Sequence, residues 1–220
     1  MKKNRKFLAA FLLLGALVSC GNQPTEQPTE QPSQQETVQP SERPTQEVQG
    51  GLEEALVNIA VNKTCYLTTV GQADSDIVGN VFKKAGAVGA YTIETMLKAS
   101  DVAEGSVVFL TLGASSKGLG AAGVDEASER ARAAEFASAA QEGKFTLILF
   151  HVGGTARRGT SSDPIIEAAF PGAAACFLVS TGNEDGFFTN LASTNNVSLY
   201  EVDKALSLVD YAKGLFGKAE

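Results

Sequence analysis

The sequence predicts a three-layer α/β domain, in which helices cover both faces of a mainly parallel sheet of about five strands. Short apolar runs rich in β-branched and aromatic residues alternate with helical patterns along residues 51–220. Continuously apolar runs are typical of parallel strands, because crossover helices bury both faces of the sheet. This region is long enough for one domain with a sizeable core.

Five apolar runs are predicted as strands, and four of them lead into loops that carry glycine or aspartate. The runs are residues 64–70, 106–112, 145–150, 174–180 and 197–202. Right-handed crossovers between parallel strands place the loops after the strands at one edge of the sheet. Open α/β sheets bind their ligands at that edge, so polar residues in these loops are the candidate site.

Four helices are predicted between and after the strands. Residues 76–86 space their apolar positions by three and four, and residues 125–143 are rich in helix formers and end at a glycine. Residues 163–170 begin with Asp163 as the expected N-cap and with Pro164 at the first helical position. Residues 203–216 are expected to form the last helix.

Residues 1–19 are predicted to be a lipoprotein signal peptide. Basic residues precede the apolar stretch 7–18, which is shorter than the roughly 20 residues of a membrane span. The following LVSC resembles the lipobox of bacterial lipoproteins, which implies that Cys20 is lipidated. An ordinary signal peptide and a short uncleaved anchor are the alternatives. In the lipoprotein reading, several acyl chains such as palmitate hold the protein outside the cytoplasm on a bacterial membrane.

Residues 20–50 are predicted to be a disordered spacer after the lipidated cysteine. The motif PTEQ recurs there and almost no residue is apolar, so little surface is available to offset the entropy of ordering. The whole chain has 18 Lys and Arg against 25 Asp and Glu. Four of the basic residues lie in 1–19, so the remainder has a net charge of −11. This charge argues against nucleic acid as a partner.

The loops at the predicted ligand edge combine glycines with fixed positive charges. Backbone amides in glycine-rich loops bind anions, and guanidinium and ammonium groups attract them. The candidate ligand residues are Gln72, Ser116, Lys117, Gly118, His151, Gly153, Gly154, Arg157, Arg158, Asp163 and Asp185. Each has a structural alternative: the glycines form turns, the arginines pair with acids, Asp163 caps a helix, and His151 is a buried histidine with its hydrogen bonds satisfied.

No cofactor or metal is predicted. GLGAAG (118–123) does not directly follow a strand, as a dinucleotide fingerprint requires, and GASSKGLG lacks P-loop spacing. The single histidine excludes a multi-histidine metal site. A Mg²⁺ or Ca²⁺ site formed by the carboxylates of Asp74, Asp76 and Asp185 is an alternative, which the spacing of these residues supports only weakly. Cys65 and Cys176 are favoured as free buried thiols, although pairing is not excluded.

Four motif blocks resemble an exported bacterial family, the domain of unknown function 6305. They are GQADSDIV, ASSKGLGAAGVDEASERAR, HVGGTARRGTSSD and GNEDGFFT, in this order, and the resemblance covers roughly residues 60–205. The resemblance implies a secreted, Rossmann-like domain. It assigns no catalytic roles, but it supports the prediction that the polar residues of these blocks belong to one site.

Two functions compete on these observations. The first is a tethered extracytoplasmic domain that binds a small anion, such as a carboxylate or phosphate, for a membrane partner such as a transporter or sensor. The second is a hydrolase or transferase with His151 as general base and with Arg157, Arg158 and Lys117 stabilising negative charge. A purely structural lipoprotein is a third alternative. Both arginines are expected to face solvent, where their loss costs little stability.

Overall fold

The computed structural model describes residues 51–218, which contain a six-stranded, all-parallel sheet. The predicted signal peptide, Cys20 and spacer lie outside the described residues. The strand order is β2-β1-β3-β4-β5-β6. The strands are β1 (Cys65–Val70), β2 (Thr92–Ile93), β3 (Val107–Leu112), β4 (Thr146–His151), β5 (Ala173–Val179) and β6 (Ser198–Val202). The prediction of a parallel sheet is confirmed, and β2 is an additional short strand at its edge.

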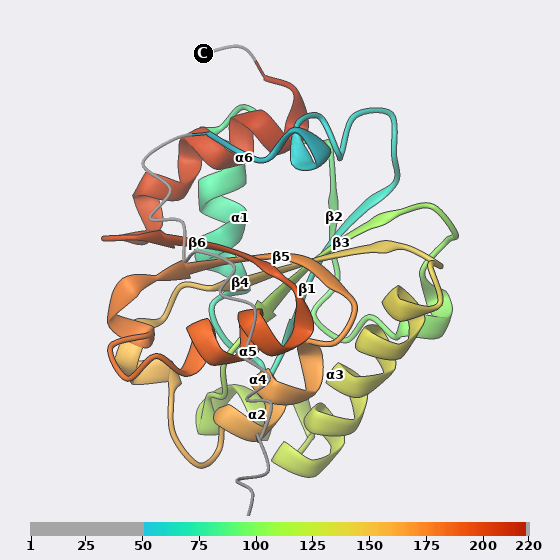
Figure 1. Ribbon diagram of the computed structural model, residues 1–220. Coiled ribbons are helices and arrows are strands. Elements are labelled where there is room, and N and C mark those ends of the chain that lie inside the picture. The colour runs from blue at the N-terminus through green and yellow to red at the C-terminus, as the bar shows by residue number, and fades with distance from the viewer. Residues whose placement is uncertain (1–50, 219–220) are drawn as a thin grey trace, which may run out of the picture. The chain divides into compact units, whose positions relative to one another are not determined.

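Helices cover both faces of the sheet, which gives the predicted three layers. In Figure 1, α1 and α6 lie on one side of the sheet, and α3, α4 and α5 lie on the other. The helices are α1 (Ser75–Lys84), α2 (Ser116–Ala122), α3 (Glu126–Gln141), α4 (Asp163–Ala169), α5 (Phe187–Asn195) and α6 (Val209–Phe216). Short 3-10 helices are η1 (Glu54–Leu56), η2 (Ala99–Asp101), η3 (Gly154–Arg157), η4 (Ser180–Gly182) and η5 (Ala205–Leu208). None of these helices is long and apolar enough to span a bilayer.

Two helix predictions need correction. Residues 203–216 were expected to form one helix, but η5 comes first and α6 begins only at Val209. Asp163 was expected to be the N-cap of the helix after β4. The N-cap is Ser162, and the Asp163 carboxylate instead accepts hydrogen bonds from Arg158 and from the backbone of Gly159. The nearby guanidinium is therefore the main partner of this carboxylate.

The core lies on both faces of the two central strands, β3 and β4. Every residue of β3 is buried, because helices lie above and below it. Towards α1 and α6, Phe82 packs edge-on against the rings of Phe109, Phe150 and Phe216. Towards α3, α4 and α5, the opposite face packs leucine and phenylalanine side chains. Burial on both faces is what makes these strands continuously apolar in the sequence.

The two cysteines of the domain are free and buried, as favoured from the sequence. Cys65 is on β1 and Cys176 is on β5, with β3 and β4 between them. Three strand spacings separate their backbones by about 14 Å. A disulfide requires Cα atoms within about 7 Å, so the sheet order keeps these thiols apart.

The described chain enters the domain at the amino edge of the sheet. The backbone N–H of Glu53 donates to the Tyr200 hydroxyl at 3.1 Å, and its carboxylate accepts from Ser198, the first residue of β6, at 2.8 Å. The Asn58 amide donates to the carbonyl of Gly214 in the last turns of α6. Gly51 and the residues after it are thus attached beside the start of β6.

The strand order creates a topological switch point between β1 and β3. The chain leaves β1 for α1 on one face of the sheet, and it leaves β3 for α2 and α3 towards the other face. The loops after β1 and β3 therefore diverge from neighbouring strands. In open α/β sheets this divergence at the carboxyl edge is where ligands bind.

Candidate functional site

The loop after β1 has an unusual backbone conformation at the switch point. Gln72 and Asp74 both have left-handed φ angles, of 58° and 61°. Residues other than glycine, asparagine and aspartate rarely adopt this backbone conformation, so Gln72 in particular is strained. Such strain persists only when surrounding contacts enforce it, and it clusters at functional sites.

A buried ion pair of α3 enforces this conformation. Glu129 Oε2 accepts hydrogen bonds from the Gly71 amide at 2.6 Å and from Gln72 Nε2 at 3.0 Å. Arg132 donates to both carboxylate oxygens of Glu129, at 3.0 and 2.8 Å, and also to the carbonyl oxygens of Leu97 and Thr69. Sequence reasoning missed this pair. Its only signal is the Glu-x-x-Arg spacing in the block ASERAR, which places both side chains on one face of a helix.

Gln72 faces the loop after β2 rather than the arginines. Its side-chain nitrogen lies 3.4 Å from the carbonyl oxygen of Thr95 and 3.2 Å from the sulfur of Met96. The amide is therefore shared between α3 and this loop. The structure places Gln72 at the predicted edge, with its donors directed at protein groups.

Arg157 reaches across the switch point from the loop after β4 to the loop after β1. Its Nε lies 3.2 and 3.1 Å from the two carboxylate oxygens of Asp74. The Asp74 side chain is 7% exposed, whereas that of Arg157 is 31% exposed. The two terminal nitrogens of Arg157 make no hydrogen bond within residues 51–218. The ion pair thus orients the guanidinium and leaves its outer N–H groups available.

Glycines at the ends of β3 and β4 make room for this arginine. An added Cβ at Gly153 would overlap Arg157 Cγ and the Asp74 carboxylate. An added Cβ at Gly113, whose φ is +139°, would lie 2.9 Å from Arg157 Cβ. The glycine-rich character of these loops therefore serves the close approach of the Arg157 side chain.

Arg158 is committed to protein groups. Its five N–H donors bond to both carboxylate oxygens of Asp163, both of Asp185, and the carbonyl of Gly182. Its guanidinium carbon lies 4.0 Å from the centre of the Phe187 ring. Hydrogen bonds from Arg158 and from the Phe187 amide lower the pKa of Asp185 to about 2. The side chain is only 11% exposed, so the expectation that Arg158 faces solvent is wrong.

His151 is fully buried at the end of β4. Nδ1 lies 3.1 Å from the Leu112 carbonyl oxygen, and Nε2 lies 3.1 Å from that of Gly154. The ring packs on Phe188 with 4.7 Å between ring centres. Burial lowers the pKa of this imidazole. The structure therefore brings no solvent-facing base to the carboxyl edge from this position.

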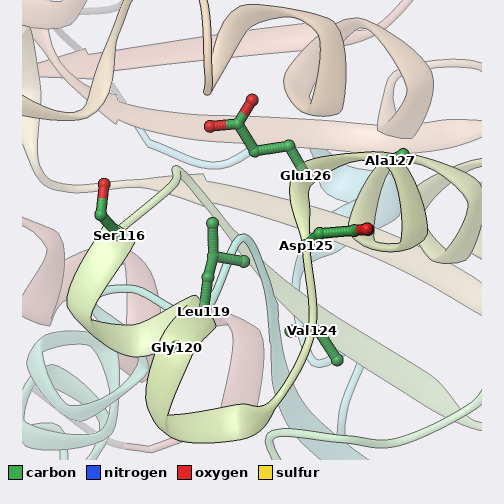
Figure 2. Close-up of a pocket in the computed structure, with 7 residues that line it drawn as sticks. All are labelled: Ser116, Leu119, Gly120, Val124, Asp125, Glu126 and Ala127. Atoms are coloured by element: carbon green, nitrogen blue, oxygen red, sulfur yellow. The ribbon is translucent and has the colours of Figure 1, made fainter.

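Ser116, Lys117 and Gly118 lie at the start of α2, on the other side of the switch point. The Gly118 amide donates to the hydroxyl of the N-cap Ser115, and an added Cβ at Gly118 would overlap the Gln72 carbonyl oxygen. Lys117 is exposed and forms no ion pair within the described domain. Beside it is an open hollow of about 490 Å³ (Figure 2), lined by Ser116, Leu119, Gly120, Val124, Asp125, Glu126 and Ala127. Its two acidic residues make this hollow unsuitable for an anion.

Among residues 51–218, no group of three or more His, Cys, Asp or Glu side chains is arranged to hold a metal ion.

The predicted ligand residues fall into two sets. Arg157 joins Asp74 at the switch point, with Gln72, Ser116, Lys117 and Gly118 on the flanking loops. Arg158, Asp163 and Asp185 tie the loops after β4 and β5 together, with His151 buried beneath them and Gly154 close to Thr181.

The fold and the switch-point loops define a Rossmann-like α/β domain. The family model described as Domain of unknown function (DUF6305) matches residues 62–216. The chain therefore belongs to this family. No curated protein and no solved structure matches the chain.

Proposed function

We propose that the protein is a lipid-anchored extracytoplasmic domain that binds a small anionic ligand, a carboxylate or phosphate, at the switch point. The observation that carries this proposal is the partly exposed Arg157, which Asp74 holds through Nε while its terminal nitrogens have no partner among the described residues. The ligand would serve a membrane partner such as a transporter or sensor.

The chemistry of Arg157 favours an anion with two acceptor oxygens. A guanidinium offers parallel N–H groups that match carboxylate or phosphate, which a lysine ammonium cannot reproduce. Asp74 is also the N-cap residue of α1, and the amides of Ser75 and Asp76 in its first turn make no backbone hydrogen bond within the described residues. These amides face the same end of the sheet and add to the attraction for an anion.

The flanking residues have supporting roles in the proposal. Lys117 contributes positive charge that no acid of the described residues neutralises by an ion pair. Ser116 contributes an exposed hydroxyl at the first position of α2. Catalysis by His151 is not part of the proposal, because the imidazole is buried and both ring nitrogens face carbonyl oxygens.

Anion titration of Arg157 variants tests the binding proposal. Sulfate, phosphate and short dicarboxylates are titrated by calorimetry into the wild type, Arg157→Ala, Arg157→Lys and the control Arg130→Ala. Loss of a charge-assisted donor should weaken binding about ten- to hundredfold. Arg130 is exposed on α3, so its variant should bind like the wild type. Equal affinities in all four proteins, or no binding by the wild type, would contradict the proposal.

The membrane anchor is tested separately through Cys20. Cys20→Ala should move the protein from the membrane fraction to the soluble extracytoplasmic fraction, because no acyl chain is then attached. Immunoblots of fractionated cells measure this distribution. An unchanged distribution would overturn the lipid anchor and leave the anion site unaffected.

A further inference from the structure

His151 lies between two hydrogen-bond acceptors. Its two ring nitrogens are each 3.1 Å from a carbonyl oxygen, of Leu112 at the end of β3 and of Gly154 at the start of η3. Carbonyl oxygens only accept hydrogen bonds. A neutral imidazole has one N–H group and an imidazolium has two. Only the protonated side chain can therefore donate to both carbonyls.

The second hydrogen bond would fix the turn that carries Arg157. Gly154 and Arg157 are the first and last residues of η3. In the neutral state one ring nitrogen presents a lone pair to its carbonyl, so the imidazole can make only one of the two hydrogen bonds. Protonation converts this contact into a bond that ties η3 to the neighbouring strand.

We propose that His151 is a proton-dependent positioning residue of the anion site. When its imidazole gains a proton, it donates to both Leu112 and Gly154, holds η3 against β3, and so strengthens the binding of an anion to Arg157. The inference rests on the proposed function. Because binding and protonation are reciprocal, a bound anion should also favour the protonated imidazole.

The surroundings set the pH range of this effect. Burial lowers the pKa of His151, the two carbonyls oppose this, Arg158 lowers it further, and Asp74 raises it. Asp163 and Asp185 are both paired with Arg158, and the ring's other neighbours, Phe188 and Gly182, carry no charge. The imidazole is therefore neutral near pH 7, and it takes up its proton below the usual value of about 6.5.

The sign of the stability change follows from this lowered pKa. The unfolded chain binds the His151 proton more tightly than the folded chain does. The free energy of unfolding of the wild type therefore decreases as the pH falls below about 6.5. A bound anion should reduce that loss. Stability and anion affinity are thus expected to change in opposite directions as the solution is acidified.

Sulfate is the probe, because its charge is constant over the working range. Its affinity is measured at about pH 5 and pH 8 for the wild type, His151→Gln and Arg157→Ala. The acid-to-neutral affinity ratio of the wild type should exceed that of His151→Gln by about threefold or more, while Arg157→Ala should bind weakly throughout. Protonation of other groups at low pH affects sulfate binding by the wild type and by His151→Gln alike. Comparing the two proteins therefore removes this contribution.

The wild type also provides a measurement that needs no variant. The chain contains one histidine, so nuclear magnetic resonance of its imidazole nitrogens has a single assignment. Saturating sulfate should raise the midpoint of its titration by about half a pH unit for a threefold coupling. A midpoint unmoved by bound sulfate would overturn the inference, even if His151→Gln fails to fold.

The outcomes separate the inference from the proposed function. Sulfate binding that requires Arg157 but has the same pH dependence in the wild type and His151→Gln overturns the role of His151 alone. Absence of sulfate binding at every pH overturns both. An upward shift of the imidazole midpoint together with acid-strengthened, Arg157-dependent binding supports both.

Discussion

At the scale of single residues, two adjacent arginines have different environments. Arg157 bonds to Asp74 through Nε alone among the described residues, whereas Arg158 uses all five donors within the protein. The sequence predicts positive charge at this edge of the sheet. It does not predict the partners, because Asp74 and Asp185 come from loops after other strands and their distances depend on the strand order.

Arg158→Ala is expected to destabilise the domain. The change removes the link between the loops after β4 and β5 and the contact with Phe187. The free energy of unfolding should fall by about 1–3 kcal/mol, as for a lost hydrogen-bonded charge. Urea unfolding measures this loss. Arg130→Ala is the matched control, with an effect within about 0.5 kcal/mol. Equal stabilities of the two variants would show that the Arg158 cluster is energetically neutral.

At the scale of elements, prediction succeeded where a helix or strand has its own pattern. The alanine-rich stretch 125–143 forms α3 (Glu126–Gln141), with a capping box at Asp125 and Ser128. β2 was missed because it has two residues, both exposed, which is too short for a strand pattern. The role of Glu129 and Arg132 was also missed, since the same spacing is typical of solvent-exposed pairs on helices. Their burial follows from the position of α3 across the end of β1.

Glu129→Gln tests how α3 controls the loop after β1. The change leaves Arg132 buried without its carboxylate and weakens the bonds to Gly71 and Gln72. Breaking a buried pair should lower the free energy of unfolding by about 3 kcal/mol or more. Glu126→Gln, at an exposed position of the same helix, should be close to neutral. Chemical denaturation measures the free energy of unfolding of both variants. Similar small losses of this free energy would contradict the proposal that Glu129 enforces the conformation of the loop.

At the scale of the whole molecule, the apolar character of the central strands was enough to predict a parallel, two-faced sheet. The order of the strands was not predictable, because periodicity describes each strand alone and not its neighbours. This order also determines which side chains meet. It separates Cys65 from Cys176, and it brings the loop of Asp74 within reach of Arg157.

The two domain thiols should report on opening of the entire core. Both are buried, and burial raises the pKa of Cys65 to about 11 and that of Cys176 further, so little reactive thiolate exists near pH 7. A Cys20→Ala protein leaves these as its two thiols. A chromogenic thiol reagent should then modify none in the native state and both in denaturant. Rapid native labelling of either thiol would contradict the packing around it.

The attachment point at the start of β6 bears on access to the proposed anion site. Glu53 is held at the amino edge of the sheet, whereas Asp74 and Arg157 lie at the carboxyl edge. A polymer joined to one end of a rigid body least obstructs the other end. If Cys20 carries the lipid, the segment that follows it joins the domain at the edge of the sheet opposite the anion site. A solute or partner protein that binds at Arg157 would then approach an edge of the sheet that the attachment of Glu53 leaves uncovered.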